Sequence, residues 1–385
     1  MLAINKHETT LLLIHINTGI MIRKINLVQL EKYQIIMNKP LFQAHPKLKK
    51  NIPCLSLSRL PTPIQKFSPM DNLWIKRDDL SHEIYGGNKI RKLEFILAEA
   101  LAQGKKHLIT FGATGTNHGV ATSMLCQEVG LDCKVFLFNQ PVTETVVNNL
   151  KMMLVYNAEL KHKGSLFNTA ASFYLSKIFK PKAYHLFAGG SNIVGCISFV
   201  NAAFELKQQI EQQLTPEPDF IYCPVGSSST LAGLSLGCSL AGLKTQVIGV
   251  RVAPSHVGLI QSCTIKTVSQ LRNKAYQLLK STDSSIPNFK LPNIQLIDNY
   301  YGRGYGVATE KGNQATNTFL KEGLKLDPTY TAKAAAAALD RSRLQPSNNI
   351  LYWHTYNSAD TNTVTAKANI NLLPETLKKI ILDFS

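Results

Sequence analysis

The stretch "GGNKIRKLEFILAEAL", Gly86–Leu101, predicts the start of an amphipathic helix with a lysine in its first turn. Asn88 is a candidate N-cap. Apolar residues recur at helical spacing and predict one buried face: Ile90, Leu93, Leu97 and Leu101. Lys89 then lies where the positive end of the helix dipole disfavours an ammonium by roughly 0.3–1 kcal/mol. Two interpretations are open. Lys89 points into solvent, as Lys92 is expected to do, or it is an amine of lowered pKa that forms a Schiff base.

The composition is that of a globular protein. The chain has 385 residues, of which 44% are hydrophobic and 17% charged, so it has room for one large or two medium domains. Its seven cysteines form no CxxC pair and lie mostly in apolar runs such as "IYCPVG", Ile221–Gly226. This pattern predicts neither a disulfide framework nor a metal site, and it favours a cytoplasmic protein.

The net charge of +17 raises the hypothesis of nucleic-acid binding. The lysines are scattered along the chain, however, so a generally basic surface without a specific nucleic-acid site is expected.

The apolar run "LLLIHINTGIMI", Leu11–Ile22, is shorter than the ~20 residues that span a membrane. Residues 1–36 are interpreted as an extension ahead of the globular part, with neither a signal peptide nor a membrane span.

From about residue 70 onward, short apolar runs alternate with helical patterns. Five runs read as strands: "KHLITFGA" (106–113), "CKVFLF" (133–138), "FIYCPVG" (220–226), "QVIGVRVA" (246–253) and "ILYWHT" (350–355). Strand–loop–helix repetition predicts an α/β fold with parallel sheets. Ligands of such folds bind at the loops beyond the carboxyl ends of the strands. These loops are "GATGTNH" (112–118), "GGSN" (189–192), "PVGSSST" (224–230), "YGRGYG" (301–306) and "WHTYN" (353–357).

The loop "PVGSSSTLAG", Pro224–Gly233, is a candidate anion cradle. Backbone N–H groups at a helix start and neighbouring hydroxyls are suited to a phosphate. The residues concerned are Gly226, Ser227, Ser228, Ser229 and Thr230. An ordinary capped strand-to-helix loop explains the same residues. No Gly-Lys-Ser/Thr follows, so this is not the loop of a P-loop nucleotide-binding protein.

Three further groups of residues are weaker signals when taken one at a time. Thr116, Asn117 and His118 lie at a helix start where they could hold a carboxylate, although capping and packing explain them equally well. Tyr305 and Tyr330 lie in loops where a phenol can move protons, or they are structural. Together with Lys89 and the anion cradle, these residues form the set that pyridoxal phosphate needs.

The order and spacing of several segments resemble the D-cysteine desulfhydrase and 1-aminocyclopropane-1-carboxylate deaminase family of pyridoxal-phosphate enzymes. The segments are "LPTPIQ" (60–65), "WIKRDDL" (74–80), "GGNKIRKLEF" (86–95), "TFGATGTNHGVAT" (110–122), "AGGSNIVG" (188–195), "GYGVATEKG" (304–312) and "LDPTYTAKA" (326–334). The resemblance runs from about Leu57 to Trp353. It implies the two-domain, tryptophan-synthase β-like fold of type II, with parallel sheets and helices on both faces.

The same resemblance implies domains and roles. Residues 37–91 and 200–385 would form a large cofactor-binding domain, residues 92–199 a small one, and the protein would be a homodimer. Lys89 would carry the cofactor, with contacts from Asn88, Asn117, Thr355 and the loop Gly226–Thr230. The substrate, a small amino acid, would meet Thr116, Asn117, His118 and Thr331, with Tyr305 and Tyr330 beside the reacting carbons.

Two positions favour the desulfhydrase activity over the deaminase activity. The residue after the tyrosine of "DPxY" is commonly glutamate in the deaminases and is Thr331 in this chain, and Thr355 stands where the deaminases tend to have an apolar residue. Elimination of sulfide from D-cysteine is therefore the predicted reaction. The alternatives are deamination of 1-aminocyclopropane-1-carboxylate, elimination from another β-substituted amino acid, and a catalytically silent cofactor-holding or nucleic-acid-binding relative. Tyr356 and Asn357 replace two glycines that family members often have, which leaves the substrate open.

Overall fold

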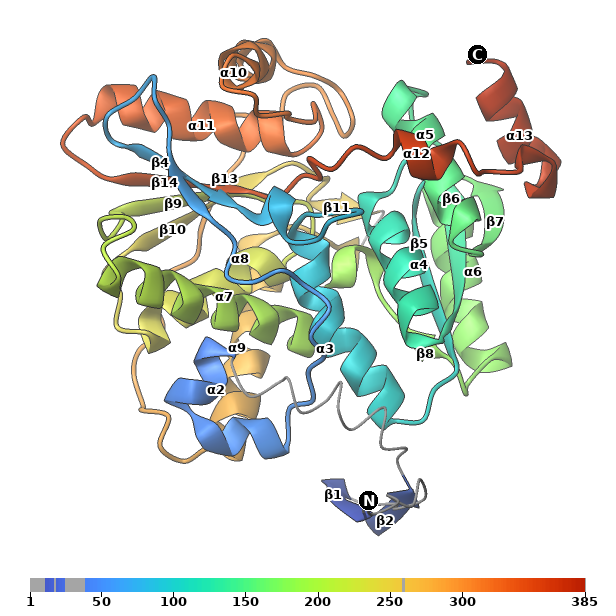
Figure 1. Ribbon diagram of the computed structural model, residues 1–385, viewed down its shortest axis with the longest axis horizontal. Coiled ribbons are helices and arrows are strands. Elements are labelled where there is room, and N and C mark those ends of the chain that lie inside the picture. Colours follow the sequence, from blue (N-terminus) through green and yellow to red (C-terminus); the bar gives the residue numbers. More distant parts are fainter. Residues whose placement is uncertain (1–10, 17–18, 25–38, 258–259, 385) are drawn as a thin grey trace, which may run out of the picture.

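The computed structural model describes residues 11–16, 19–24, 39–257 and 260–384 (Figure 1). The predicted extension, residues 1–36, lies mostly outside these ranges. Its described part is an antiparallel hairpin of β1 (Leu11–Ile16) and β2 (Gly19–Lys24). Among the described residues, no helix combines the length and the apolar character that crossing a bilayer requires.

The larger of the two main sheets has six strands in the order β13-β10-β9-β14-β4-β3. All neighbouring strands in it run parallel except β3 and β4. The strands are β3 (Ile64–Lys66), β4 (Leu73–Arg77), β9 (Phe220–Val225), β10 (Gln246–Arg251), β13 (Gln295–Ile297) and β14 (Ile350–His354). The central strands read as continuous apolar runs because both faces of a parallel sheet are covered.

The smaller sheet has four parallel strands in the order β7-β6-β5-β8. They are β5 (His107–Ala113), β6 (Asp132–Phe138), β7 (Glu159–Gly164) and β8 (Tyr184–His185). A separate short ribbon pairs β11 (His256–Val257) with β12 (Ile260–Gln261). The four-stranded sheet falls inside residues 92–199, where the small domain is predicted, but the domain boundaries themselves stay a prediction.

Helices cover both faces of each sheet (Figure 1). On the six-stranded sheet, α11 with α10 packs on one face, while α8 with α7 and α9 packs on the other. On the four-stranded sheet, α4 with α5 covers one face and α6 the other. The helices are α3 (Asn88–Ala102), α4 (Asn117–Val129), α5 (Glu144–Val155), α6 (Leu166–Phe179), α7 (Ile193–Glu211), α8 (Ser229–Leu240), α9 (Ile265–Thr282), α10 (Glu310–Leu320) and α11 (Thr331–Leu344). The predicted fold class, α/β with parallel sheets and helices on both faces, is confirmed.

Shorter elements complete the chain. The segment after β14 crosses to the smaller sheet, where its elements pack against α5 (Figure 1). These elements are α12 (Asn362–Thr365), the 3-10 turn Ile370–Leu372 and α13 (Glu375–Leu382), and at the other end of the described globular part lies α2 (Pro40–Ala44).

Helix α3 runs between the two layers and packs against α7 on one side and α4 on the other. Its N-cap is Gly87, so the prediction that Asn88 caps the helix is wrong by one residue. Gly87 has a φ of +103°, which favours glycine, and a Cβ there would lie 2.8 Å from the carbonyl oxygen of Thr355. Asn88 is therefore the first helical residue. Its side chain does not cap the helix but donates to the Thr230 hydroxyl.

A buried ionic network fixes α3 to its neighbours. Arg91 of α3 bonds to Asp78 at 2.7 Å and to Glu205 of α7 at 2.8 Å. Lys76 of β4 bonds to the same Glu205 at 2.6 Å. The indole N–H of Trp353 donates to Asp78 at 2.7 Å. Two cations balance two anions, so the network satisfies its charges internally while it joins β4, α3, α7 and β14.

Candidate active site

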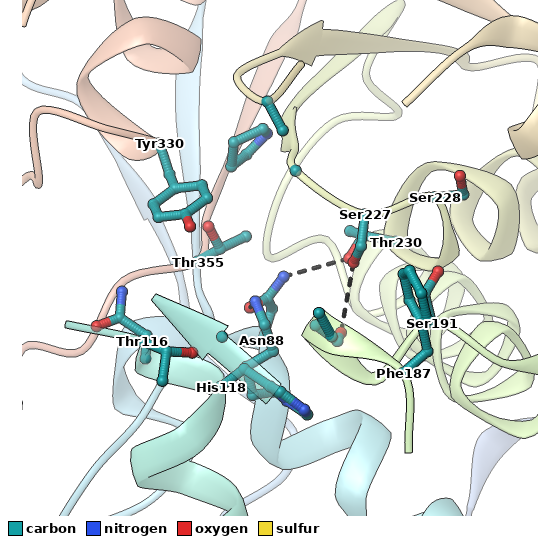
Figure 2. Close-up of a pocket in the computed structure, with 18 of the residues that line it drawn as sticks. Asn88, Thr116, His118, Phe187, Ser191, Ser227, Ser228, Thr230, Tyr330 and Thr355 are labelled. Carbon is teal, nitrogen blue, oxygen red and sulfur yellow. Dashed lines mark hydrogen bonds between the residues drawn. The ribbon is translucent and has the colours of Figure 1, made fainter. Parts of the chain in front are cut away.

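A cavity of about 530 Å³ lies where the start of α3 meets the loops that follow β5, β9 and β14. Figure 2 shows side chains from these different segments directed toward one space. The two tyrosines of the predicted site, Tyr305 and Tyr330, also line this cavity. The predicted residues that line it are Asn88, Lys89, Thr116, Asn117, His118, Gly226, Ser227, Ser228, Thr230, Tyr305, Tyr330 and Thr355. Ser229 and Thr331 are the two that do not.

Lys89 faces the cavity from the first turn of α3. Its amine donates to the Oδ1 of Asn88 at 2.8 Å. Burial lowers the pKa of Lys89 to about 8, and the negative charge of Asp327 opposes part of that shift. The helix dipole acts in the same direction as burial. A substantial neutral fraction near neutral pH is what an amine nucleophile requires.

Lys92 lies one turn farther along α3, and the expectation that it points into solvent is wrong. Its side chain is 1% exposed, lines the cavity and donates to the carbonyl oxygen of Gly189 at 3.1 Å. Its ammonium also lies 5.7 Å from the centre of the Phe199 ring. Burial, with the neighbouring charge of Lys89, holds the pKa of Lys92 well below its usual value. Solvent is excluded because α7 and the segment before it cover this side of α3.

The loop between β9 and α8 forms one wall of the cavity. Ser227 donates to the carbonyl of Gly189 at 3.4 Å, and Ser228 donates to Thr267 at 3.2 Å. The side chain of Asn88 donates to the Thr230 hydroxyl at 3.2 Å and so joins this loop to the start of α3 (Figure 2). Ser229 is fully buried and is directed away from the cavity, toward the carbonyl of Gly190 at 3.4 Å.

The start of α4 forms another wall. The Thr116 hydroxyl caps the helix by accepting from the N–H of Gly119 at 3.1 Å. Asn117 is held by two residues that the sequence patterns did not single out. The Tyr85 hydroxyl and the Asn149 amide both donate to its Oδ1 at 2.8 Å. Among the described residues, none accepts a hydrogen bond from the side-chain amide nitrogen of Asn117, which lines the cavity.

His118 is a buried, neutral histidine. Its Nε2 lies 2.9 Å from the Thr110 hydroxyl and its Nδ1 lies 3.4 Å from the Thr122 hydroxyl. Burial and the charges of Lys89 and Lys92 hold its pKa well below the usual value. Because both ring nitrogens already have partners inside the protein, this placement favours a packed histidine over a direct carboxylate contact.

Tyr305 and Tyr330 form a pair of phenols whose hydroxyl groups hydrogen-bond each other. Their rings meet edge to face with centres 6.0 Å apart. Tyr330 is also pressed against the β9–α8 loop, since a Cβ at Gly226 would lie 2.9 Å from its Cε1. Burial raises the pKa of both phenols, so both are protonated at neutral pH.

Asp327 is the carboxylate of the site, and the sequence patterns did not reveal it. Its Oδ1 accepts the backbone N–H groups of Thr329 at 3.0 Å and Tyr330 at 2.7 Å. The Thr331 hydroxyl donates to its Oδ2 at 2.6 Å. Thr331 is thus fully buried behind Asp327 and reaches the cavity only through that carboxylate. An aspartate before proline at a predicted helix start was the available signal, but it is equally typical of capping.

The residues after β14 close the cavity near Lys89. The N–H of Asn88 donates to the carbonyl of Thr355 at 3.3 Å. The Oδ1 of Asn357 accepts the N–H of Gly86 at 2.7 Å. Tyr356 and Asn357 both line the cavity, so the two residues that replace glycines are part of the site.

Comparison with known protein families gives one match across most of the chain. A family model described as "Pyridoxal-phosphate dependent enzyme" matches residues 53–355. The chain belongs to this family of pyridoxal-phosphate-dependent enzymes.

Relatives place the chain in one branch of these pyridoxal-phosphate-dependent enzymes. It is 30% identical over 323 residues to the D-cysteine desulfhydrase of Salmonella newport (strain SL254), covering 79% of this chain and 93% of that protein. The D-cysteine desulfhydrase of Salmonella typhi matches equally well, at 30% over 323 residues. A solved structure described as "Crystal Structure Analysis of the ACC deaminase homologue" is 29% identical, with a TM-score of 0.69, and covers 84% of this chain and 98% of its own. The resemblance to the D-cysteine desulfhydrase and 1-aminocyclopropane-1-carboxylate deaminase family is confirmed.

The cavity fits the cofactor of these enzymes. Gly189 and Ser227 meet at the cavity wall, where a Cβ at Gly189 would come within 2.5 Å of the Ser227 hydroxyl. The start of α8 directs backbone N–H groups toward the same space. Three lysines, Lys89, Lys92 and Lys274, and one carboxylate, Asp327, are among the described residues that line the cavity, so the lining suits an anion.

Proposed function

We propose that the chain eliminates sulfide from D-cysteine, giving pyruvate, ammonia and hydrogen sulfide with one water consumed. The observation that carries the proposal is the meeting of three groups in one cavity: the Lys89 amine, the Gly226–Thr230 loop and the Tyr305–Tyr330 pair. The names of the Salmonella relatives, which cover most of this chain, support the same substrate.

Bound pyridoxal phosphate supplies an electron sink for the pair left behind when the substrate loses its Cα proton. Lys89 would hold the cofactor, and its amine would be available as a base when it is not so engaged. With a pKa of about 8, this amine is a base suited to taking the Cα proton near neutral pH. Asn88 keeps the amine oriented through its 2.8 Å bond.

The remaining residues would hold the substrate and its leaving group. Thr116 and Asn117, at the positive end of α4, are suited to the substrate carboxylate. The protonated pair of Tyr305 and Tyr330 would donate a proton to the departing thiolate. The Gly226–Thr230 loop, joined to α3 through Asn88, would fix the phosphate and hence the distance between the cofactor and Lys89.

The test is a product assay on purified protein loaded with pyridoxal phosphate. Sulfide and pyruvate are expected in equal amounts from D-cysteine, and much more slowly from L-cysteine. Sulfide release from neither enantiomer would overturn the proposal. Release from β-chloro-D-alanine alone would instead show elimination from another β-substituted amino acid.

Deamination of 1-aminocyclopropane-1-carboxylate is the second candidate, favoured by the structural likeness to the ACC deaminase homologue. Thr331 distinguishes the two activities only indirectly. Its hydroxyl is bonded to Asp327 at 2.6 Å and does not reach the cavity. A glutamate at this position would add a second carboxylate beside Asp327. The same assay decides between the candidates through ammonia release from 1-aminocyclopropane-1-carboxylate.

Two further properties belong to this proposal. A homodimer is expected from the family resemblance, and light scattering of the purified protein would test it. A cytoplasmic location is supported by the seven cysteines, all of which are free and buried. Cell fractionation would test the location.

A further inference from the structure

Tyr356 occupies a position where family members often have glycine, and its backbone is fixed beside Lys89. A Cβ at Gly87 would lie 3.1 Å from the carbonyl oxygen of Tyr356. On either side of it, Thr355 accepts from Asn88 and Asn357 accepts from Gly86, at 3.3 and 2.7 Å. The backbone at this position therefore cannot move away from the start of α3 without breaking these contacts.

The Tyr356 side chain reaches from one layer of the protein to the other. Its backbone follows β14 of the six-stranded sheet, and its phenol lies near the side chain of Thr145 in the first turn of α5, which opposes part of the rise that burial causes in the pKa of Tyr356. Helix α5 packs on α4 and β7 of the four-stranded layer. Tyr356 also lies near enough to Tyr85 to affect the pKa of its phenol, and Tyr85 in turn bonds to Asn117; all three residues line the cavity.

We propose that the ring of Tyr356 is a wall of the substrate end of the cavity and limits the size of the substrate side chain. Glycine would leave this space empty, whereas a tyrosine fills it with a rigid ring that reaches toward Thr145. Amino acids with small β-substituents would fit, and those with bulky side chains would be excluded. The inference rests on the proposed function to the extent that it assigns this end of the cavity to an amino acid.

Binding of D-amino acids that lack a leaving group tests the wall without requiring elimination. The absorbance of the bound cofactor is titrated with D-alanine and with D-phenylalanine, and the ratio of the two dissociation constants is compared among variants. Tyr356→Gly is expected to improve binding of D-phenylalanine relative to D-alanine by at least about tenfold. Tyr356→Phe, which keeps the ring, is the matched control and should leave the ratio within about threefold of the wild type.

An unchanged ratio in Tyr356→Gly and in Tyr356→Ala, with the cofactor band intact in at least one of them, would overturn the proposal. An equal gain in Tyr356→Phe would also overturn it, because the ring would then not be the barrier. The proposed function and the proposed role of Tyr356 can be contradicted independently of each other. Wild-type protein that binds D-alanine but releases no sulfide from D-cysteine would end the proposed function, while the ratio would still decide the role of Tyr356.

Discussion

The hydroxyl groups of Tyr305 and Tyr330 hydrogen-bond each other although 25 residues separate them in the chain. One of the two must donate while the other accepts, so they act as a unit. Replacing either with phenylalanine is expected to lower kcat by about 10²-fold or more, as for loss of a proton donor. The double variant should be little worse than either single one. Steady-state sulfide assays on the three variants check this, and multiplicative losses would show that the phenols act independently.

Lys89→Ala should abolish turnover, with kcat reduced by more than about 10³-fold, because both the attachment point and the base are lost. The characteristic near-visible band of the lysine-bound cofactor should also disappear. Borohydride reduction followed by peptide mass analysis provides a direct check, since the wild type should be labelled at Lys89. A labelled peptide elsewhere in the chain would contradict the assignment.

The rate at which cofactor-free protein takes up pyridoxal phosphate should depend on pH through Lys89. Its folded-state pKa is lowered to about 8, so the reactive neutral amine increases up to that pH and then levels off. The uptake rate should rise about fivefold from pH 7 to pH 8 and by less than about twofold from pH 8 to pH 9. A rate that kept rising tenfold per pH unit up to pH 10 would indicate an ordinary lysine.

Asp327→Asn should move this pH profile downward. The Asp327 carboxylate raises the pKa of Lys89 against the larger effect of burial, so neutralising it lowers the pKa further. The amide keeps an oxygen to accept from the N–H groups of Thr329 and Tyr330, so the start of α11 should remain intact. Asp340→Asn is the matched control. Asp340 lies on α11, is bonded to Lys311, and is not among the residues that line the cavity. It should leave the uptake profile where it is.

Glu205→Gln should destabilise the protein strongly. Only the carboxylate of Asp78 would remain to balance the charges of the buried Lys76 and Arg91. Breaking a buried ion pair of this kind costs about 3–5 kcal/mol of the free energy of unfolding. Glu211→Gln, on the same helix, removes an exposed partner of Lys207 and should cost at most about 0.5 kcal/mol. Urea unfolding of the two variants beside the wild type provides the comparison. Similar midpoints for both variants would show that the buried network adds little.

Local sequence patterns predicted β5, β6, β9, β10 and β14 but not the shorter or more polar strands β3, β4, β7, β8 and β13. Most of the predicted site residues lie together because α/β folds bring the ends of parallel strands together. The α3 helix, with Lys89 in its first turn, followed from the apolar spacing and the preceding glycines, whereas the cofactor role of Lys89 came from the family resemblance. The cap was displaced from Asn88 to Gly87 because the φ of +103° reflects contact with Thr355, far along the chain. Such a contact leaves no trace in a local pattern.

The errors at Lys92 and the omission of Asp327 share a physical cause. Helical spacing indicated one buried face of α3, yet the helix lies between two layers, so Lys92 is covered as well. Asp327 resembles a capping residue, and it is one, but tertiary packing also directs its charge toward Lys89. Thr331 was predicted to touch the substrate because the family resemblance gives that position a residue that differs between the deaminases and the desulfhydrases. A helix start directs successive side chains in different directions, and Thr331 points into the core.

The central position of β14 has a consequence for biosynthesis. Residues 350–354 insert between β9 and β4, which the ribosome produces far earlier. The four-stranded sheet, by contrast, is complete once residue 185 has emerged. The nascent chain can therefore fold its smaller sheet during translation, while the edges of β4 and β9 wait unpaired for β14. Since Thr355 and Tyr356 follow β14 directly, the cavity cannot close around a cofactor until residues 350–356 have emerged from the ribosome.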